Sequence, residues 1–127
     1  MKMERVFKTR LFSRWARKAG LIDDAFCVAV AEMANGLIDA DLGGGVVKKR
    51  VALAGRGKSG GSRTLVATNR ADRWFFVFGF EKNERANIND KELEALQATA
   101  ADLLKLSADE LNNAVTQEIL QEICNDD

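Results

Sequence analysis

The order of apolar and polar positions predicts a strand and two helices at the start of the chain. Residues 6–7 begin a short apolar segment typical of a strand, and apolar side chains then recur every four residues over 11–19, as on one face of a helix. Gly20 is expected to end that helix. Asp23 and Asp24 suit the N-terminus of a second amphipathic helix by capping and by interaction with its dipole.

Beyond the glycines at 43–45, the pattern changes to one that favours strands. Three segments rich in Val, Thr, Phe and Trp predict an antiparallel meander: VVKKRVAL (46–53), SRTLVATN (62–69) and RWFFVFGF (73–80). In the first segment, Val47 and Val51 are expected on one face, with Lys48 and Arg50 on the other. The third segment is apolar on both faces, which suits a central strand.

The C-terminal region is predicted to be helical. Asn89 with Glu92 three residues later, and Ser107 with Glu110, have the spacing of helix caps. The second of these helices is predicted to carry apolar residues every four positions from 111 to 123. Together these elements predict one α+β domain over residues 1–127.

Composition narrows the class of protein. Hydrophobic residues make up 46% and charged residues 30% of the 127 positions, which is typical of a globular protein. No apolar run has the length of a membrane span, and the first residues lack the pattern of a signal peptide, so a cytoplasmic location is expected. Cys27 and Cys124 are interpreted as small core residues, and neither a metal nor a cofactor is expected, since the chain has no histidine.

Charge is distributed unevenly along the chain. Residues 1–85 contain 17 Lys or Arg against 9 Asp or Glu, whereas residues 86–127 contain 2 against 10. The strongest basic cluster falls within 46–73, where Asp72 is the one acidic residue. Such a cluster attracts polyanions by releasing their counterions. The cluster consists of Lys48, Lys49, Arg50, Arg56, Lys58, Arg63, Arg70 and Arg73.

The segment ALAGRGKS (52–59) fits a relaxed phosphate-loop pattern but lacks the context of one. A phosphate loop leads into a helix whose N-terminus faces the phosphates. Here Gly60, Gly61 and a strand-like segment follow instead, and no apolar strand ends in an Asp that would hold magnesium. We therefore expect a glycine-rich hairpin loop over 55–61 and no bound nucleotide.

Three segments in this order resemble the RelE/HigB-like toxins of bacterial type II toxin–antitoxin systems. The resemblance covers nearly the whole chain. The segments are DADLGGGVVKKRVALAGRGKSGGSRTLVAT (39–68), FFVFGFEKNERANIND (75–90) and ELEALQATAADLLKLSADEL (92–111).

The resemblance implies a RelE/ParE-like fold, with an antiparallel twisted sheet, an N-terminal helical pair and C-terminal helices. It also implies an mRNA interferase, an endoribonuclease that cuts messages in the ribosomal A site. The partner would be a cognate antitoxin, often a helix-turn-helix protein in this branch. The positions that match the family's basic site are Lys48, Arg50, Arg63, Lys82 and Arg85. A position that is often aromatic in relatives is Ser62 here, and the chain has no Tyr.

Metal-free cleavage of RNA needs a base for the 2′-OH, stabilisation of the phosphate charge and a proton for the leaving oxygen. Lys82 or Lys48, or else Glu81 or Glu84, are the candidate bases, and Arg63 is suited to hold the phosphate. The predicted catalytic residues are thus Arg63, Lys82, Arg85 and Lys48. The predicted RNA-binding residues are Arg50, Lys49, Arg56, Lys58 and Arg73.

Two other functions stay open at this point. The absence of His and Tyr favours a non-catalytic toxin that blocks its target, as the related ParE branch does with DNA gyrase. An inert relative that retains only the fold and antitoxin binding is the other alternative. The mapping of RNA ends after expression separates these from an RNA-cleaving enzyme.

Overall fold

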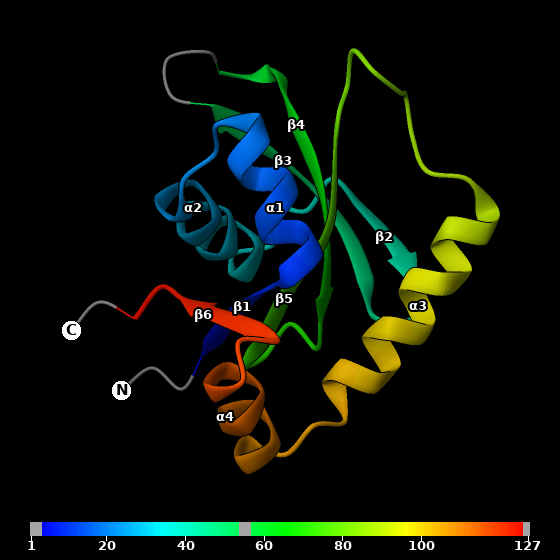
Figure 1. Ribbon diagram of the computed structural model, residues 1–127. Coiled ribbons are helices and arrows are strands. Elements are labelled where there is room, and N and C mark those ends of the chain that lie inside the picture. Colours follow the sequence, from blue (N-terminus) through cyan, green and yellow to red (C-terminus); the bar gives the residue numbers. More distant parts are fainter. Residues whose placement is uncertain (1–3, 54–56, 126–127) are drawn as a thin grey trace.

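The computed structural model describes residues 4–53 and 57–125, with only the backbone described for residues 53 and 57–60. A six-stranded, mostly antiparallel sheet lies between two helical layers (Figure 1). The predicted α+β class is confirmed. The elements are β1 (Arg5–Thr9), α1 (Arg10–Ala19), α2 (Asp23–Ala34), β2 (Ala40–Gly43), β3 (Val46–Leu53), β4 (Gly57–Thr68), β5 (Arg73–Glu81), α3 (Asp90–Leu104), α4 (Ala108–Thr116) and β6 (Leu120–Ile123).

The strands follow the order β2-β3-β4-β5-β1-β6 across the sheet. β1 pairs with β5 in parallel, and the other neighbours are antiparallel. The predicted meander of β3, β4 and β5 is confirmed. β4 begins at Gly57, earlier than predicted, so Lys58 and Ser59 belong to a strand and do not begin a helix. The hairpin loop expected over 55–61 is therefore shorter, and residues 54–56 lie outside the described chain.

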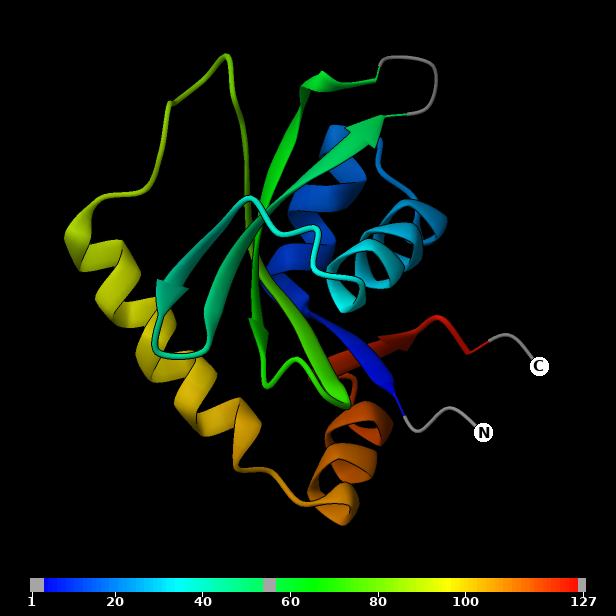
Figure 2. The same cartoon turned by 180° about the vertical axis from the view of Figure 1, so that it is seen from behind.

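Separate apolar cores fill the two sides of the sheet, and Figure 2 shows the helical layers from behind. α1 and α2 pack on one face, where Trp74 and Phe76 of β5 are buried. α3 and α4 pack on the other face, against Phe75 and Val77. The burial of alternate β5 side chains on both faces confirms that β5 is a central strand.

The helix ends predicted at Gly20, Asn89 and Ser107 are confirmed, but the capping role expected of Asp23 and Asp24 is wrong: Ile22 is the N-cap of α2 and makes no side-chain cap bond, and the two aspartates lie in the first turn, where they suit the helix dipole. Thr9 accepts a hydrogen bond from the Phe12 amide at the start of α1, and Gly20 ends the helix in the left-handed conformation, with φ of 76°. Asn89 and Ser107 each form a full capping box, with Glu92 and Glu110 respectively. These side chains satisfy amide groups that the helix itself leaves unpaired.

The prediction that the last helix extends to residue 123 is wrong. α4 ends at Thr116, Glu118 adopts a positive φ of 61°, and the chain then enters β6. Leu120 and Ile123 are three residues apart, so as strand residues they point to opposite faces of the sheet. Leu120 enters the core below α3 and α4, and Ile123 enters the core below α1 and α2. Burial on both faces thus favours the strand over a longer helix.

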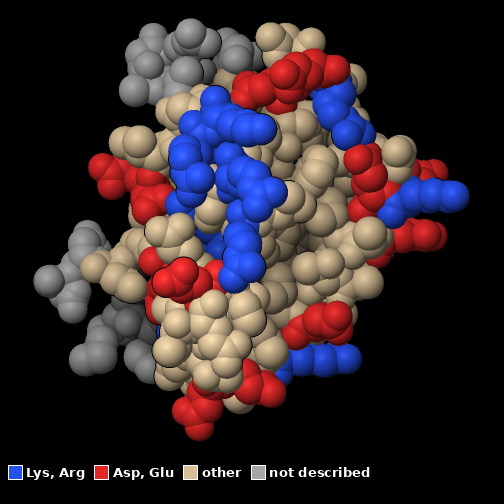
Figure 3. Space-filling view, in the orientation of Figure 1, with Lys and Arg blue, Asp and Glu red and all other residues tan. Residues whose placement is uncertain are grey.

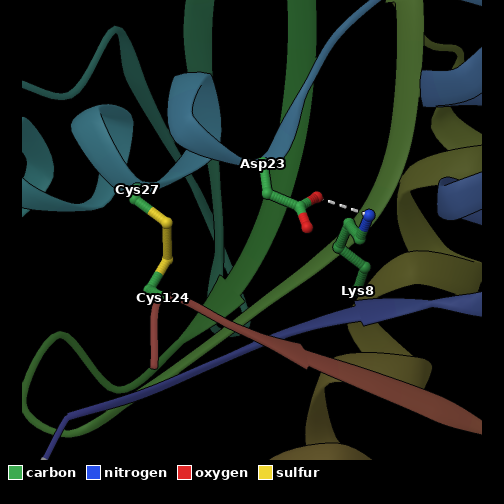
Figure 4. Close-up of a disulfide and its surroundings, with 4 residues drawn as sticks. All are labelled: Lys8, Asp23, Cys27 and Cys124. Atoms are coloured by element: carbon green, nitrogen blue, oxygen red, sulfur yellow. Dashed lines mark hydrogen bonds and ion pairs between the residues drawn. A yellow bond between two sulfur atoms is a disulfide. The ribbon is translucent and has the colours of Figure 1, made fainter. Parts of the chain in front are cut away.

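The interpretation of the two cysteines as separate core residues is also wrong. Cys27 on α2 and Cys124, directly after β6, form a disulfide with a Cα–Cα distance of 5.6 Å (Figure 4). The two residues are 97 positions apart in the sequence, and only the placement of β6 beside β1 brings them together. The bond fixes the end of the edge strand to the helical layer.

Over the described residues, no helix combines the length and apolar character that crossing a membrane requires.

Candidate nucleic-acid interface

The basic candidates gather on the sheet face opposite α1 and α2. In the pairing of β3, β4 and β5, Arg50 lies opposite Arg63, and Arg63 lies opposite Phe80. These three side chains form a row across three strands on one face, which we call the arginine row. A second row, two residues along each of β3, β4 and β5, consists of Lys48, Leu65 and Phe78. Side chains in such positions are neighbours across the strands.

Two arginines face each other within the arginine row. Paired like charges on adjacent strands oppose folding, so their presence suggests a function that needs them. Asp39 offsets part of the repulsion, because its carboxylate accepts a hydrogen bond from Arg50 Nε at 3.1 Å and another from the Arg50 amide. Arg63 donates to the Gly61 carbonyl at 3.2 Å. Both guanidinium groups are thereby oriented while their side chains stay accessible, Arg50 exposed and Arg63 half-buried.

Arg85 joins this face from the turn that follows β5. Its guanidinium group lies 5.8 Å from the centre of the Phe80 ring and donates two hydrogen bonds to Glu92 on α3, one of them 3.0 Å long. These bonds raise the pKa of Arg85 and, together with the bond from the Asn89 amide, lower the pKa of Glu92 below its ordinary value. The pair is therefore charged at neutral pH. Glu92 thus has two roles, since it also closes the capping box of α3.

The candidate bases differ in their placement. Lys82 is exposed in the turn after β5, and Lys48 is half-buried beside Arg50 on the same face. Glu81 accepts a hydrogen bond from the Ser62 hydroxyl at 2.8 Å, and strand alternation places both on the face opposite the arginine row. Glu84 is exposed in the turn. Strand alternation thus places Lys48 on the face of the arginine row and Glu81 on the opposite face, while Lys82 and Glu84 both lie exposed in the turn after β5.

Two predicted RNA-binding residues lie apart from the arginine row. Lys49 points to the opposite face, is only 4% exposed and bonds to the Leu37 carbonyl and to Glu32. Arg73 donates to the Leu106 carbonyl at the other end of β5, about 20 Å from Phe80 at the usual strand rise. We therefore leave both out of the candidate interface. Arg56 and the side chain of Lys58 lie outside the described residues.

Sequence reasoning missed the aromatic and acidic members of this face. Phe78 and Phe80 were interpreted only as parts of an apolar strand, although alternation from Arg63 through the register places them beside the basic residues. Glu92 was interpreted only as a cap. The signal for its second role is its position, because a capping box at the start of α3 holds the carboxylate near the turn that carries Arg85.

The arrangement is suited to hold a phosphodiester. Guanidinium groups offer forked donors to phosphate oxygens, and an aromatic ring supplies a surface on which a base can stack. Within the described residues, no group of three or more His, Cys, Asp or Glu side chains lies in an arrangement that would hold a metal ion. Lys48 is the lysine that strand alternation places on this face.

Comparison with known proteins places the chain in a family. The family model described as the RelE toxin of the RelE / RelB toxin-antitoxin system matches residues 4–123, which include the arginine row, Arg85 and β6. A search of curated proteins found no match. A RelE toxin functions with a cognate antitoxin, so an antitoxin is a partner of this protein. With the fold, the basic face and the match over nearly the whole sequence in agreement, the chain belongs to the RelE toxin family.

Proposed function

We propose that this toxin is a metal-independent endoribonuclease that cuts mRNA in the ribosomal A site and so inhibits translation. The observation that carries the proposal is the arginine row with Arg85 above Phe80, an accessible, oriented set of cations beside an aromatic ring. The ribosome lies in the cytoplasm, which is therefore the proposed location. The resemblance to HigB-like toxins supports a helix-turn-helix antitoxin.

The proposed reaction transfers the phosphate within the RNA chain. The 2′-oxygen forms a bond to phosphorus as the bond to the 5′-oxygen breaks, which leaves a 2′,3′-cyclic phosphate and a 5′-OH. Arg63 and Arg50 hold the phosphate oxygens, and Arg85 adds charge from the turn. One lysine amine, Lys48 or Lys82, accepts the 2′-OH proton, and the other lysine donates a proton to the leaving oxygen.

Placement by the ribosome supplies a large part of the proposed rate. The chain has no histidine, the usual proton-transfer group at neutral pH, so the chemistry on free RNA is expected to be slow. The ribosome would hold the message in one fixed orientation relative to the arginine row. The two molecules then do not have to find that orientation by diffusion.

Expression of the wild-type chain and of Arg63→Ala in bacterial cells, with genome-wide mapping of new RNA 5′ ends, tests this proposal. We expect cuts at a fixed phase within translated codons, and a fall of about 10²–10³-fold in Arg63→Ala, because a charge that stabilises the reacting phosphate is lost. Lys105→Ala is the matched control, since it removes one exposed cation directly after α3, at the end of that helix far from Glu92 and the row.

The alternatives predict different results. Growth arrest with intact messages and DNA-damage signalling would contradict RNA cleavage and favour a ParE-type block of DNA gyrase. An absence of any growth effect, in a protein that melts cooperatively, would favour an inert relative that only binds its antitoxin.

A further inference from the structure

A second basic surface lies on α1, on the other side of the sheet. Arg10, Arg14, Arg17 and Lys18 are exposed along the outer side of this helix. Figure 3 shows a continuous group of Lys and Arg side chains in the position that α1 occupies in Figure 1. Among the described residues, Arg14, Arg17 and Lys18 make no ion pair. We call this the α1 surface.

A groove of about 520 Å³ runs between the α1 surface and the C-terminal strand. Arg10, Arg14 and Arg17 line one side. The opposite side contains Val115 and Ile119, from the end of α4 and the turn after it, and Ile119 is 51% exposed. Residues of β6 form the floor, so the groove follows the edge of the sheet, with cations on one side and apolar side chains on the other.

β6 is the last strand of the sheet, and among the described strands only β1 pairs with it. Its position is fixed from several directions: Glu122 accepts two hydrogen bonds from Arg5, and the Cys27–Cys124 disulfide ties the next residue to α2. Arg10 also donates to the Glu118 carbonyl just before the strand. An edge strand that is held in place and open on one side is a template for a further strand.

The composition of the groove selects the segment that fits it. An added strand would direct alternate side chains toward α1 and toward α4. Acidic side chains would meet Arg10, Arg14 and Arg17, and apolar side chains would meet Val115 and Ile119. A nucleic acid fits less well, because the carboxylates of Glu118 and Glu122 also line the groove and an edge strand has no counterpart in RNA.

We propose that an extended segment of the cognate antitoxin, with alternating acidic and apolar residues, adds to the outer edge of β6 beneath the α1 surface. Main-chain hydrogen bonds to the edge give affinity, and the two sides of the groove give selectivity for the segment. The site lies across the sheet from the arginine row. The proposal rests on the family membership and not on RNA cleavage, so Arg63→Ala leaves antitoxin binding intact.

Calorimetric titration of the full-length toxin with the antitoxin from the same operon tests the proposal. The variant Arg14→Glu/Arg17→Glu reverses two exposed charges that make no ion pair with any described residue and do not belong to the proposed catalytic face. We expect the Kd to rise about 10²-fold, because like charges then face the acidic segment. Lys91→Glu/Lys105→Glu makes the same change in net charge on α3, and is expected to alter the Kd less than about threefold.

Hydrogen exchange separates strand addition from contact through charge alone. In the complex, the outward-facing amides within Leu120–Ile123 are expected to gain protection, since they acquire hydrogen-bond acceptors. Ile119→Asp is expected to weaken binding about tenfold through the apolar side of the groove. Protection elsewhere with β6 unchanged would overturn the proposal.

The same variants show whether the α1 surface binds RNA instead. If Arg14→Glu/Arg17→Glu lowers ribosome binding while the antitoxin Kd stays at the wild-type value, the proposal is overturned and the α1 surface is an RNA-docking face. If the charge-reversal variants of the α1 surface and of α3 bind the antitoxin with the same Kd, the antitoxin segment docks at another place and the proposal is overturned.

Discussion

The arginine row and the α1 surface are both basic, but their charges are held in different ways. In the row, Arg50 bonds to Asp39, Arg63 bonds to a main-chain carbonyl, and nearby Arg85 bonds to Glu92. On the α1 surface, Arg14 and Arg17 have no ionic partner among the described residues. One set of cations is therefore oriented before any ligand arrives, whereas the other is free to adjust.

This difference matches the two tasks that we propose. Cations that stabilise a reacting phosphate must point to one place. When neighbouring groups orient these cations before the substrate binds, no free energy is spent on reorienting them during the reaction. Cations that attract a partner act over a longer range, so mobility of their side chains weakens the attraction only a little. The comparison therefore assigns the oriented set to chemistry and the free set to docking. The following predictions test that division.

Removal of the disulfide is expected to have the largest effect, and to affect the docking side more than the row. The variant Cys27→Ala/Cys124→Ala should lower the free energy of unfolding by about 2–5 kcal/mol, as is usual for a bond that closes a long loop. Denaturant unfolding measures the loss. Hydrogen exchange should show earlier opening of β6 than of β4, because the bond holds the chain directly after β6.

Reduction of the wild-type protein is the control for this variant. Mass spectrometry should detect a gain of two hydrogens on reduction of the bond, and the reduced protein should unfold as the double variant does. Weaker antitoxin binding with RNA cleavage unchanged would support the division. An equal loss of both activities would contradict it, because the two surfaces would then depend on the same local order.

The fold was largely predictable because its central elements are recorded in local patterns. Strand alternation identified β3 and the two-sided burial of β5, and the caps at Asn89 and Ser107 identified the starts of α3 and α4. β6 was missed because Ile119 and Ile123 continue the four-residue spacing of apolar side chains that begins at Leu111. Only the contacts of Leu120 and Ile123 with separate cores, which are not local in sequence, select the strand.

The candidate site was predictable in part, for the same reason. Arg63 and Arg50 were expected near each other, and the register of β3 with β4 places them face to face. Lys49 lies apart from the row because one step along a strand reverses the side chain and buries it on the other face. Arg73 lies apart from it because the basic cluster in the sequence extends to the other end of β5. The register across strands is information that composition does not contain.

Gly79→Ala is expected to have the next largest effect and to disturb α1 while sparing the arginine row. Gly79 lies between Phe78 and Phe80 but faces the other side, where an added Cβ atom would overlap the Trp15 ring. Trp15 belongs to α1, so the helix must shift. We expect a loss of about 1–3 kcal/mol in the free energy of unfolding, measured by denaturant titration.

Trp15→Leu in the same chain provides the control for Gly79→Ala. The smaller side chain leaves room for the new methyl group, so the double variant should lose less than the sum of the two single changes. Antitoxin affinity is expected to fall in Gly79→Ala more than RNA cleavage does. Additive losses would show that the close approach of Trp15 to Gly79 does not limit the position of α1.

Glu92→Gln is expected to have the smallest effect, and it tests whether the row depends on carboxylates that orient its cations. The pKa of Glu92 is lowered, first by its hydrogen bond to Arg85. The stabilisation from the charged pair is therefore present above the ordinary pKa near 4.5, and it disappears as the pH falls through the lower value of the folded state. The melting temperatures of wild type and Glu92→Gln should thus differ slightly at neutral pH and converge in acid.

The same change separates two roles of Glu92 at the proposed site. If the carboxylate orients Arg85 over Phe80, RNA cleavage falls by a few-fold in Glu92→Gln, and antitoxin affinity stays unchanged. Asp90→Asn serves as the control. Asp90 is an exposed carboxylate in the same helical turn, so the change removes one negative charge without altering a contact of Arg85. A rise in cleavage would mean that Glu92 competes with the RNA phosphate for Arg85. The row would then resemble the α1 surface, where Arg14 and Arg17 make no ion pair with any described residue.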